Sequence, residues 1–313
     1  MVLFLIVHTM CDLCCKDCFY SKGYEKRDSN KLELKDIELF VQKIYDLKFE
    51  TIILTGGDPL YSKRKNVTYA LVECLKKRNI KVIINTSGAN LTYNDIQILI
   101  NLRVDRIDFS INSVDEKLNN AERGKYQDTV FAITNLLDSG YKKISTTTVI
   151  TEENSFKVLE TLQWLKLLGV EDVRYQPVFK QGEQNYSLLR KTMLGCNKLF
   201  GKEHSNNFLL QCDKAYNEEK PHNKSICMMG KEIFVSDALG NIYPCFHRFD
   251  VKLGNIFDDD IELLRDKLKN NNFYSKKHNC FGKHCVSLFD NGIFWEKKKK
   301  YEKECLSIPN LYE

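Results

Sequence analysis

Four cysteines lie within the short segment MCDLCCKDCFYS, at Cys11, Cys14, Cys15 and Cys18. Cysteine thiolates bind zinc and iron, so this segment is the first candidate for chemistry. It contains two C-x2-C pairs, but they follow one another with no intervening residue, which is too tight for the usual zinc ribbon. Three of the thiolates, spaced C-x3-C-x2-C or C-x2-C-x3-C, suit an iron–sulfur cluster better. If three cysteines bind a four-iron cluster, one iron keeps an open site, as a catalytic metal requires.

The bulk composition predicts an ordinary globular chain. Its 313 residues, 43% of them hydrophobic, suffice for one large α/β domain, or for a domain of roughly 200 residues and a smaller one. The net charge of +5 is spread along the chain, so we expect no nucleic-acid partner. The apolar start MVLFLIV lacks a basic region and a cleavage site, so neither a signal peptide nor a membrane segment is expected. In a cytoplasmic protein, twelve cysteines indicate metals or redox chemistry instead of disulfides.

A strand–helix rhythm runs through the first part of the chain. The predicted strands are residues 2–8, 51–55, 81–86, 106–111, 144–150 and 173–178. The predicted amphipathic helices fall within 32–48, 68–78, 93–102, 126–140 and 156–169. Six such repeats indicate a parallel sheet covered by helices, either doubly wound or an incomplete (β/α) barrel. In both folds the active site lies at the carboxyl ends of the strands, where Cys11, Gly56, Ser87 and Asn112 follow the first four strands.

The spacing of Cys11, Cys15 and Cys18 after the first strand resembles the signature of radical S-adenosylmethionine (radical SAM) enzymes. In that family the open iron is chelated by the amino and carboxylate groups of the methionine of SAM. The resemblance therefore implies a [4Fe-4S] cluster with an open site for SAM. It also implies a partial (β/α)6 TIM-like barrel, which we expect over residues 1–185.

The segment TGGDP after the second strand resembles the GGE motif of the same family, with Asp58 where glutamate is usual. Gly56 and Gly57 would let the backbone approach the ligand and expose carbonyls to the SAM ammonium group, and Asp58 would add charge. In DFSINSVD, Ser110 and Asn112 resemble an element near the SAM ribose and carboxylate, and Arg123 would pair with that carboxylate. Further cofactor neighbours implied by the resemblance are Asp17, Tyr20, Pro59, Asn85, Ser87, Gln176 and Val178, although strand-end packing is an alternative for the last four.

The segment CMMGKEIFVSDALGNIYPC resembles the opening of the SPASM and twitch extensions, which carry auxiliary iron–sulfur clusters. It also predicts a β-hairpin with a Gly-Asn turn that delivers a cysteine. The resemblance implies one auxiliary [4Fe-4S] cluster, with Cys212 or Cys305 as substitutes for one ligand; its expected ligands are Cys227, Cys245, Cys280 and Cys285. The alternative is a zinc ribbon on the same cysteines, aided by His278 and His284.

These patterns predict three parts of the chain. They are the barrel (1–185), a bridging segment (186–226) and a SPASM/twitch-like auxiliary-cluster domain (227–313). Among the remaining thiols, Cys74 is expected in the core, and Cys14 is not expected to be a ligand.

The resemblance spans residues 2 to about 290 and implies reductive cleavage of SAM to a 5′-deoxyadenosyl radical, which abstracts a hydrogen atom from the substrate. The leading hypothesis is maturation of a ribosomally synthesised peptide by a cross-link, a thioether or an epimerisation. The alternatives are a radical dehydrogenase of a sugar or cyclitol alcohol and a non-enzymatic zinc-ribbon module. An electron donor such as flavodoxin or ferredoxin is expected, and no N-terminal leader-recognition domain, since the first strand begins at residue 2. For epimerisation, Cys196 and Cys212 are candidate hydrogen-atom donors; ordinary loop thiols are the alternative.

Overall fold

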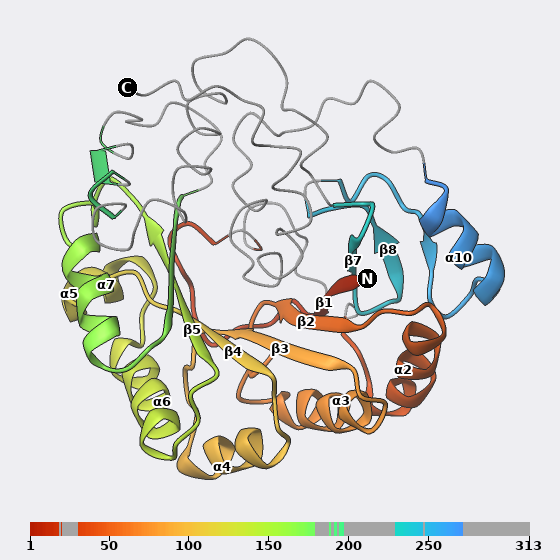
Figure 1. The fold of residues 1–313 in the computed structure, drawn as a ribbon, viewed down its shortest axis with the longest axis horizontal. Coiled ribbons are helices and arrows are strands. Elements are labelled where there is room, and N and C mark those ends of the chain that lie inside the picture. The colour runs from red at the N-terminus through yellow and green to blue at the C-terminus, as the bar shows by residue number, and fades with distance from the viewer. Residues whose placement is uncertain are drawn as a thin grey trace, which may run out of the picture.

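The computed structural model describes residues 1–18, 20, 31–178, 188, 191–192, 194–196, 229–246 and 248–271 of the chain. Six parallel strands lie side by side in their chain order (Figure 1). They are β1 (Val2–His8), β2 (Thr51–Gly56), β3 (Lys81–Thr86), β4 (Arg106–Ser110), β5 (Ile144–Ile150) and β6 (Asp172–Pro177). Each begins and ends within one residue of its predicted bounds, and the sheet stays open, so the predicted α/β partial barrel is confirmed.

Helices cover one face of this sheet, which we call the outer face (Figure 1). The predicted segments appear as α2 (Ile37–Asp46), α3 (Lys65–Lys77), α4 (Tyr93–Asn101), α6 (Tyr126–Asp138) and α7 (Val158–Leu167). Their apolar stripes pack on the outward side chains of the strands in one large outer cluster. The periodicity did not predict the short helix α5 (Glu116–Glu122), and the 3-10 turn η1 (Leu34–Asp36) precedes α2. None of the described helices is long and apolar enough to span a membrane.

Three further strands extend the same sheet beyond β1. β7 (Ile233–Ser236) pairs with β1 in parallel, and β8 (Asn241–Tyr243) and β9 (Gly254–Asn255) follow in antiparallel pairing. The predicted hairpin is therefore confirmed as β7–β8. Helix α10 (Ile261–Lys269) follows β9 and buries Leu264 and Leu268 in the outer cluster. The predicted division at residue 227 stays a prediction, but the described part of the C-terminal region shares its sheet with the barrel.

The inner face of the sheet, opposite the helices, has two chemically different halves. Side chains alternate between the faces along a strand, so every second residue points inward. Register places Arg106 of β4 beside Ile83 of β3, and Asp108 beside Asn85. The half formed by β4, β5 and β6 is therefore polar. The half formed by β7, β1, β2 and β3 is an inner apolar cluster that includes Val2, Phe4, Ile6, Ile53, Ile83, Ile233 and Val235.

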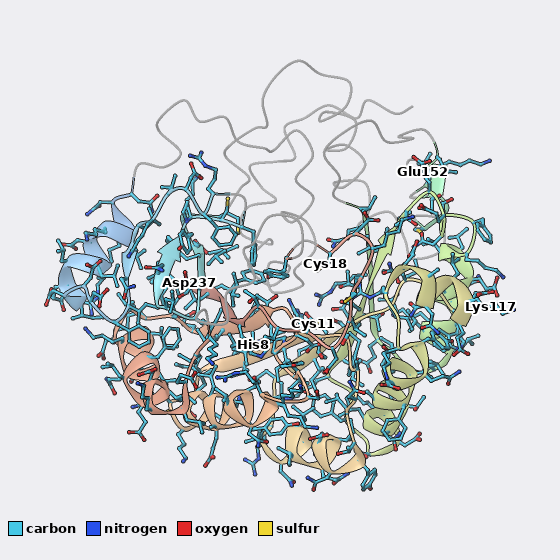
Figure 2. The ribbon with its side chains drawn as sticks, turned by 180° about the vertical axis from the view of Figure 1, so that it is seen from behind. His8, Cys11, Cys18, Lys117, Glu152 and Asp237 are labelled. Atoms are coloured by element: carbon cyan, nitrogen blue, oxygen red, sulfur yellow. The ribbon has the colours of Figure 1, made fainter. Side chains whose placement is uncertain are left out.

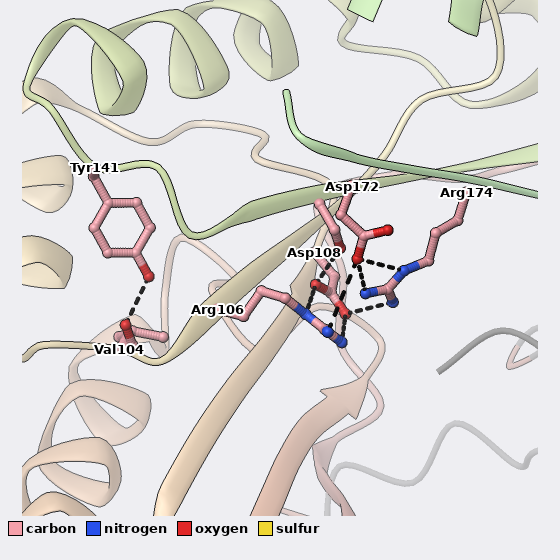
Figure 3. Close-up of polar contacts among 7 residues, drawn as sticks. Val104, Arg106, Asp108, Tyr141, Asp172 and Arg174 are labelled. Carbon is pink, nitrogen blue, oxygen red and sulfur yellow. Dashed lines mark hydrogen bonds and ion pairs between the residues drawn. The ribbon is translucent and has the colours of Figure 1, made fainter. Parts of the chain in front are cut away.

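Four charged residues on the polar half form what we call the charged quartet: Arg106, Asp108, Asp172 and Arg174 (Figure 3). Arg106 Nε donates to Asp108 Oδ1 at 2.6 Å, and Arg174 donates to Asp108 Oδ2 at 3.3 Å. Arg174 Nε also donates to Asp172 at 2.9 Å, and the Ser145 hydroxyl donates to Asp108. Only 7% of Asp108 and 5% of Arg174 is exposed, so each charge needs its partner.

Candidate functional site

The cysteine loop, residues 11–18, follows β1 at the carboxyl-end edge of the sheet, as the sequence predicts. Figure 2 shows Cys11 and Cys18 on the side of the sheet away from α3 and α4. Cys14 is exposed, whereas Cys11, Cys15 and Cys18 are half-buried. The three half-buried thiols are the set with the C-x3-C-x2-C spacing. The structure thus separates Cys14 from them.

Cys15 and Cys18 lie close enough to Cys11 to influence its ionisation. Burial raises the pKa of Cys11 to about 12, and the neighbouring Asp58, Cys15 and Cys18 raise it further. Burial also raises the pKa of Cys15; Arg123 opposes this rise and Cys18 adds to it. Thiols in this state are protonated at neutral pH, so binding of a metal cluster as thiolates would release protons.

Gly56 and Gly57 let the end of β2 pack directly on the backbone that leads into the cysteine loop. Gly57 N donates to His8 O, and Asp58 N to Met10 O, each at 2.9 Å. A Cβ at Gly57 would lie 2.1 Å from Met10 O. Gly56 has φ +134°, and a Cβ there would lie 2.2 Å from His8 O. The sequence predicts that these glycines let backbone approach a cofactor; the structure shows that they approach the backbone between β1 and the cysteine loop.

The Asp58 carboxylate joins the ends of β2 and β3. It accepts hydrogen bonds from Thr86 Oγ1 at 2.8 Å, from Ser87 N at 2.8 Å and from Ser87 Oγ at 2.5 Å. Leu60 N donates to it as well, at 2.9 Å. Burial raises the pKa of Asp58, and these donors oppose the rise. The hydroxyl of Ser87, a predicted cofactor neighbour, therefore donates its hydrogen bond to Asp58.

The carboxyl end of α5 supports the cysteine loop from the other side. Lys16 N donates to Glu122 O at 2.8 Å, and Cys15 Sγ lies 3.7 Å from Arg123 O, which accepts from it. Arg123 Nε is buried and has no hydrogen-bond partner among the described residues. A buried guanidinium N–H in this state is suited to a ligand carboxylate. This supports the predicted role of Arg123.

Asn112, predicted near the SAM ribose, is buried with both polar atoms of its amide bound to the protein. Its Nδ2 donates to Glu122 Oε2 at 2.7 Å, and its Oδ1 accepts from Val149 N at 3.2 Å. Asn85 differs, because its Oδ1 is buried on the inner face without a partner in the described part of the chain. Asn85 is therefore the better placed of the two amides to contact a ligand.

The other predicted cofactor neighbours lie around the same edge. Tyr20 OH is 3.1 Å from Thr55 Oγ1, and the Tyr20 ring packs on the inner apolar cluster. Ser110 ends β4 next to Thr147, Gln176 lies on β6, and Val178 N donates to Ile150 O at 2.8 Å. Asp17 is half-buried within the cysteine loop, and Pro59 is buried just after the glycines.

Most of the predicted auxiliary ligands lie outside the described residues. These are Cys227, Cys280 and Cys285, together with the alternatives Cys212, Cys305, His278 and His284. Cys245 follows β8 and is buried in the inner apolar cluster. Cys74 packs against the outer cluster, as predicted, and Cys196 is fully buried in that cluster, where burial raises its pKa to about 12. Cys196 thus occupies a core position, and its role as a hydrogen donor stays a prediction.

The sequence analysis missed three residues at this site: Asp12 and Glu122, which hold it together through hydrogen bonds, and His8, which is buried at the end of β1. Asp12 accepts from Ser62 N at 2.9 Å and from Ser62 Oγ at 2.7 Å, which ties the cysteine loop to the segment after β2. An acidic residue inside the cysteine motif could have suggested such a tie. No local pattern could have indicated Glu122 or His8, because their partners come from distant segments.

His8 is a buried imidazole whose two ring nitrogens have no hydrogen-bond partner among the described residues. Its ring meets Tyr61 edge-on, with 5.9 Å between centroids. Burial, and then the positive charge of Arg64, lower the pKa of His8 to about 4.

We expect His8 to make the fold sensitive to acid. The unfolded chain binds a proton at His8 near pH 6.5, whereas the folded chain resists it down to about pH 4. Stability from this group is therefore complete above pH 6.5 and falls as the pH drops to 4, by about 3 kcal/mol in total. Urea unfolding of wild type and His8→Gln at several pH values in this window tests it. The variant should show the shallower pH dependence, and equal slopes would contradict this.

A Gly57→Ala variant should lose iron binding, because the new methyl group meets the backbone of Met10, directly before the cysteine loop. Gly140→Ala is the control, since a Cβ there has no heavy atom within 4 Å and pays only for its φ of +78°. Iron content per chain after anaerobic reconstitution is the measurement. If both variants bind iron like the wild type, the close approach at Gly57 has no effect on the loop.

The donor set fits the four-iron cluster that the sequence predicts. No three His, Cys, Asp or Glu side chains among the described residues surround a single metal ion. Cys11, Cys15 and Cys18 are nevertheless electrostatic neighbours, and soft thiolates of this number are the usual ligands of an iron–sulfur cluster. Arg123 Nε and Asn85 Oδ1 add a donor and an acceptor without partners in the described part of the chain. Together they could bind the polar groups of an amino-acid-like cofactor.

Comparison with known proteins identifies the family of the segment that contains the site. A family model described as the radical SAM superfamily matches residues 5–165. The GTP 3′,8-cyclase of Pasteurella multocida (strain Pm70) is 25% identical over 188 residues, which cover 58% of this chain and 54% of that protein. The GTP 3′,8-cyclase of Actinobacillus pleuropneumoniae serotype 5b (strain L20) is 22% identical over 314 residues, covering 92% of this chain and 89% of that protein. The chain thus spans about half the length of the first of these relatives.

Solved structures share the fold. The crystal structure of Streptococcus suis SuiB bound to precursor peptide SuiA matches with a TM-score of 0.70 at 16% identity, over 91% of this chain and 70% of that one. Native anSMEcpe with bound AdoMet matches with a TM-score of 0.67 at 17% identity, over 97% of this chain and 96% of that one. The family model covers more than half of the chain, including the cysteine loop, both glycines and Arg123. The chain therefore belongs to the radical SAM superfamily.

Proposed function

We propose that this radical SAM protein modifies a ribosomally synthesised peptide, by a cross-link, a thioether or an epimerisation. When bound, the [4Fe-4S] cluster and SAM supply a 5′-deoxyadenosyl radical that removes a hydrogen atom from the substrate. The protein's own residues bind and orient these groups and exclude water. The observation that carries the proposal is the grouping of Cys11, Cys15 and Cys18 beside Gly57 and Arg123 at one edge of the sheet.

Each of these residues has a separate task. The three thiolates would hold the cluster, and the two glycines let the backbone just before the cysteine loop pack closely on the end of β2. Arg123 would bind the SAM carboxylate through the buried Nε that has no partner among the described residues. Asp58 would act indirectly, since its carboxylate already accepts hydrogen bonds from Thr86 and Ser87.

The inner face favours a peptide over a highly charged substrate. A nucleoside triphosphate needs several cations, but the arginines of the charged quartet are both paired with Asp108, and Asp172 supplies the second negative charge, so the quartet is neutral within the face. The other half of the face adds no cations, because the inner apolar cluster consists of buried apolar side chains. SuiB, whose fold is similar, was solved with a precursor peptide, which also supports this choice.

A second candidate is cyclisation of GTP. It is favoured by the sequence relatives, which are GTP 3′,8-cyclases at 25% identity or less. The phosphate groups of a nucleotide would then have to be bound by cationic side chains outside the described inner face.

For the C-terminal region we propose one auxiliary [4Fe-4S] cluster held by Cys227, Cys245, Cys280 and Cys285, within the SPASM/twitch-like domain that the sequence predicts. Cys245 is the one of these four in the described part, and it emerges from β8 next to the inner face. An external electron donor such as flavodoxin or ferredoxin would reduce the SAM-binding cluster.

The test is anaerobic incubation of iron-reconstituted protein with SAM and dithionite, in parallel with GTP and with the peptides encoded beside its gene. We expect 5′-deoxyadenosine in all reactions and a mass change in one of the peptides. Conversion of GTP with no change in any peptide would replace the first candidate by the second. Zinc in place of iron, with no 5′-deoxyadenosine, would overturn both.

A further inference from the structure

We propose that Glu122 is a positioning residue for SAM binding: its buried carboxylate holds the end of α5, from which Arg123 faces the cysteine loop. This rests on the proposed function, in which Arg123 binds the SAM carboxylate. The residue would act through Arg123 and would not touch the reacting atoms.

The Glu122 carboxylate is buried and fully hydrogen-bonded by neutral groups. Only 6% of the residue is exposed. Its Oε2 accepts from Asn112 Nδ2 at 2.7 Å and from Asn154 Nδ2 at 3.0 Å, and its Oε1 accepts from Thr151 Oγ1 at 2.5 Å. These donors come from the end of β4 and from the segment after β5, so one carboxylate joins three parts of the chain that are distant in sequence.

The donors of Glu122 are themselves held in place. Asn154 Oδ1 accepts from Thr151 N at 2.9 Å, and its Nδ2 also donates to Val149 O at 2.7 Å. Asn112 N donates to Asn119 Oδ1 at 2.9 Å. Asn119 belongs to α5, the same helix that ends at Glu122. Glu122 therefore sits in a closed network of short contacts, and such networks hold a single geometry.

This network lies directly behind the SAM-binding groups. The backbone at Glu122 and Arg123 accepts from Lys16 N and from Cys15 Sγ in the cysteine loop. A second contact joins the cysteine loop to the segment after β5, which also supplies donors to Glu122: Lys16 Nζ donates to Glu153 Oε1 at 2.5 Å. A shift of the α5 end would therefore displace Arg123 relative to the cysteine loop.

A buried carboxylate costs stability, because taking the charge out of water is expensive and neutral donors compensate only in part. An apolar residue would fill the same space without that cost. The presence of the charge together with three donors indicates a requirement for exact placement of the α5 end, and Arg123 is the residue there with an unused donor in the described structure.

The test compares SAM affinity of reconstituted protein, by equilibrium dialysis, for Glu122→Ala and Glu122→Gln. The glutamine keeps the shape: its oxygen can accept from both asparagines and its amide can donate to Thr151 Oγ1. We expect the glutamine variant to bind within about 3-fold of wild type and the alanine variant at least about 10-fold more weakly, with KM for SAM rising more than kcat falls. Glu116→Gln, an exposed carboxylate at the start of α5, is the control and should bind like wild type.

The iron content separates positioning from general damage, because Glu122→Ala keeps all three cysteine thiols of the predicted cluster site and the backbone carbonyl at position 122. We expect iron per chain to stay at the wild-type level. Equal SAM affinity of the alanine variant and wild type would overturn the proposal for Glu122 alone, whereas a wild-type protein that binds no SAM would overturn the proposed function as well. If the alanine variant does not fold, Thr151→Val removes a single donor, and unchanged SAM affinity there would also overturn the role of Glu122.

Discussion

A Cys15→Ala variant should lose the SAM-binding cluster and with it SAM cleavage, whereas Cys14→Ala should retain both. Cys15 is half-buried and, together with Cys18, raises the pKa of Cys11, while its neighbour Cys14 is exposed. With two thiolates left, the cluster has too few ligands to stay bound. We expect 5′-deoxyadenosine formation to fall at least about 1000-fold. Iron and sulfide analysis after anaerobic reconstitution, together with chromatography of 5′-deoxyadenosine, measures both effects.

The pair Cys14 and Cys15 is a matched control, because the two residues are adjacent and of the same type. Cys11→Ala and Cys18→Ala should behave like Cys15→Ala. If the auxiliary cluster is present, iron should fall from about eight to about four per chain in these variants. A Cys14→Ala protein without iron, or a Cys15→Ala protein with full SAM cleavage, would show that the ligand set is a different one.

The largest expected loss of stability comes from breaking the charged quartet. Asp108→Ala should lower the free energy of unfolding by about 3–5 kcal/mol, because it leaves Asp172 as the one carboxylate of the quartet beside Arg106 and Arg174. The Ser145 hydroxyl would lose its acceptor too. Urea unfolding of the iron-free protein measures this without interference from cluster loss.

The surface pair Arg248 and Asp250 offers a close control. It has the same spacing along the chain, and its two hydrogen bonds are both 2.7 Å long, but the Asp250 side chain is 64% exposed. Asp250→Ala should cost less than about 1 kcal/mol, since water already solvates the exposed Asp250 carboxylate. If Asp108→Ala and Asp250→Ala lower the free energy of unfolding equally, burial of the quartet does not increase its contribution to stability.

Local patterns were enough to locate the strands and the cysteine loop. Strand segments such as 81–86 are short, apolar and β-branched, and helical periodicity fills the gaps between them, so the β–α order was predictable residue by residue. The spacing of the cysteines and the two glycines was predictable for the same reason, since both motifs are continuous in sequence. α5 was missed because its sequence, EKLNNAE, has no apolar stripe.

Contacts between distant segments could not be predicted in this way. Asn112 has the residue type of a cofactor ligand, yet its partners are Glu122 and Val149, which only folding brings together. Pairing of β7 with β1 is similar: the apolar segment IFVS predicts a strand but does not say which edge it joins.

The sequence by itself determined the family chemistry, the parallel α/β order and the loop that presents three thiols, because each depends on residues close together in the chain. The tertiary structure alone decided that the two glycines pack on the backbone just before the cysteine loop, that Cys14 faces solvent, and that the buried Glu122 carboxylate lies next to Arg123. These depend on burial and on long-range hydrogen bonds, which are set only when strands far apart in sequence share one sheet.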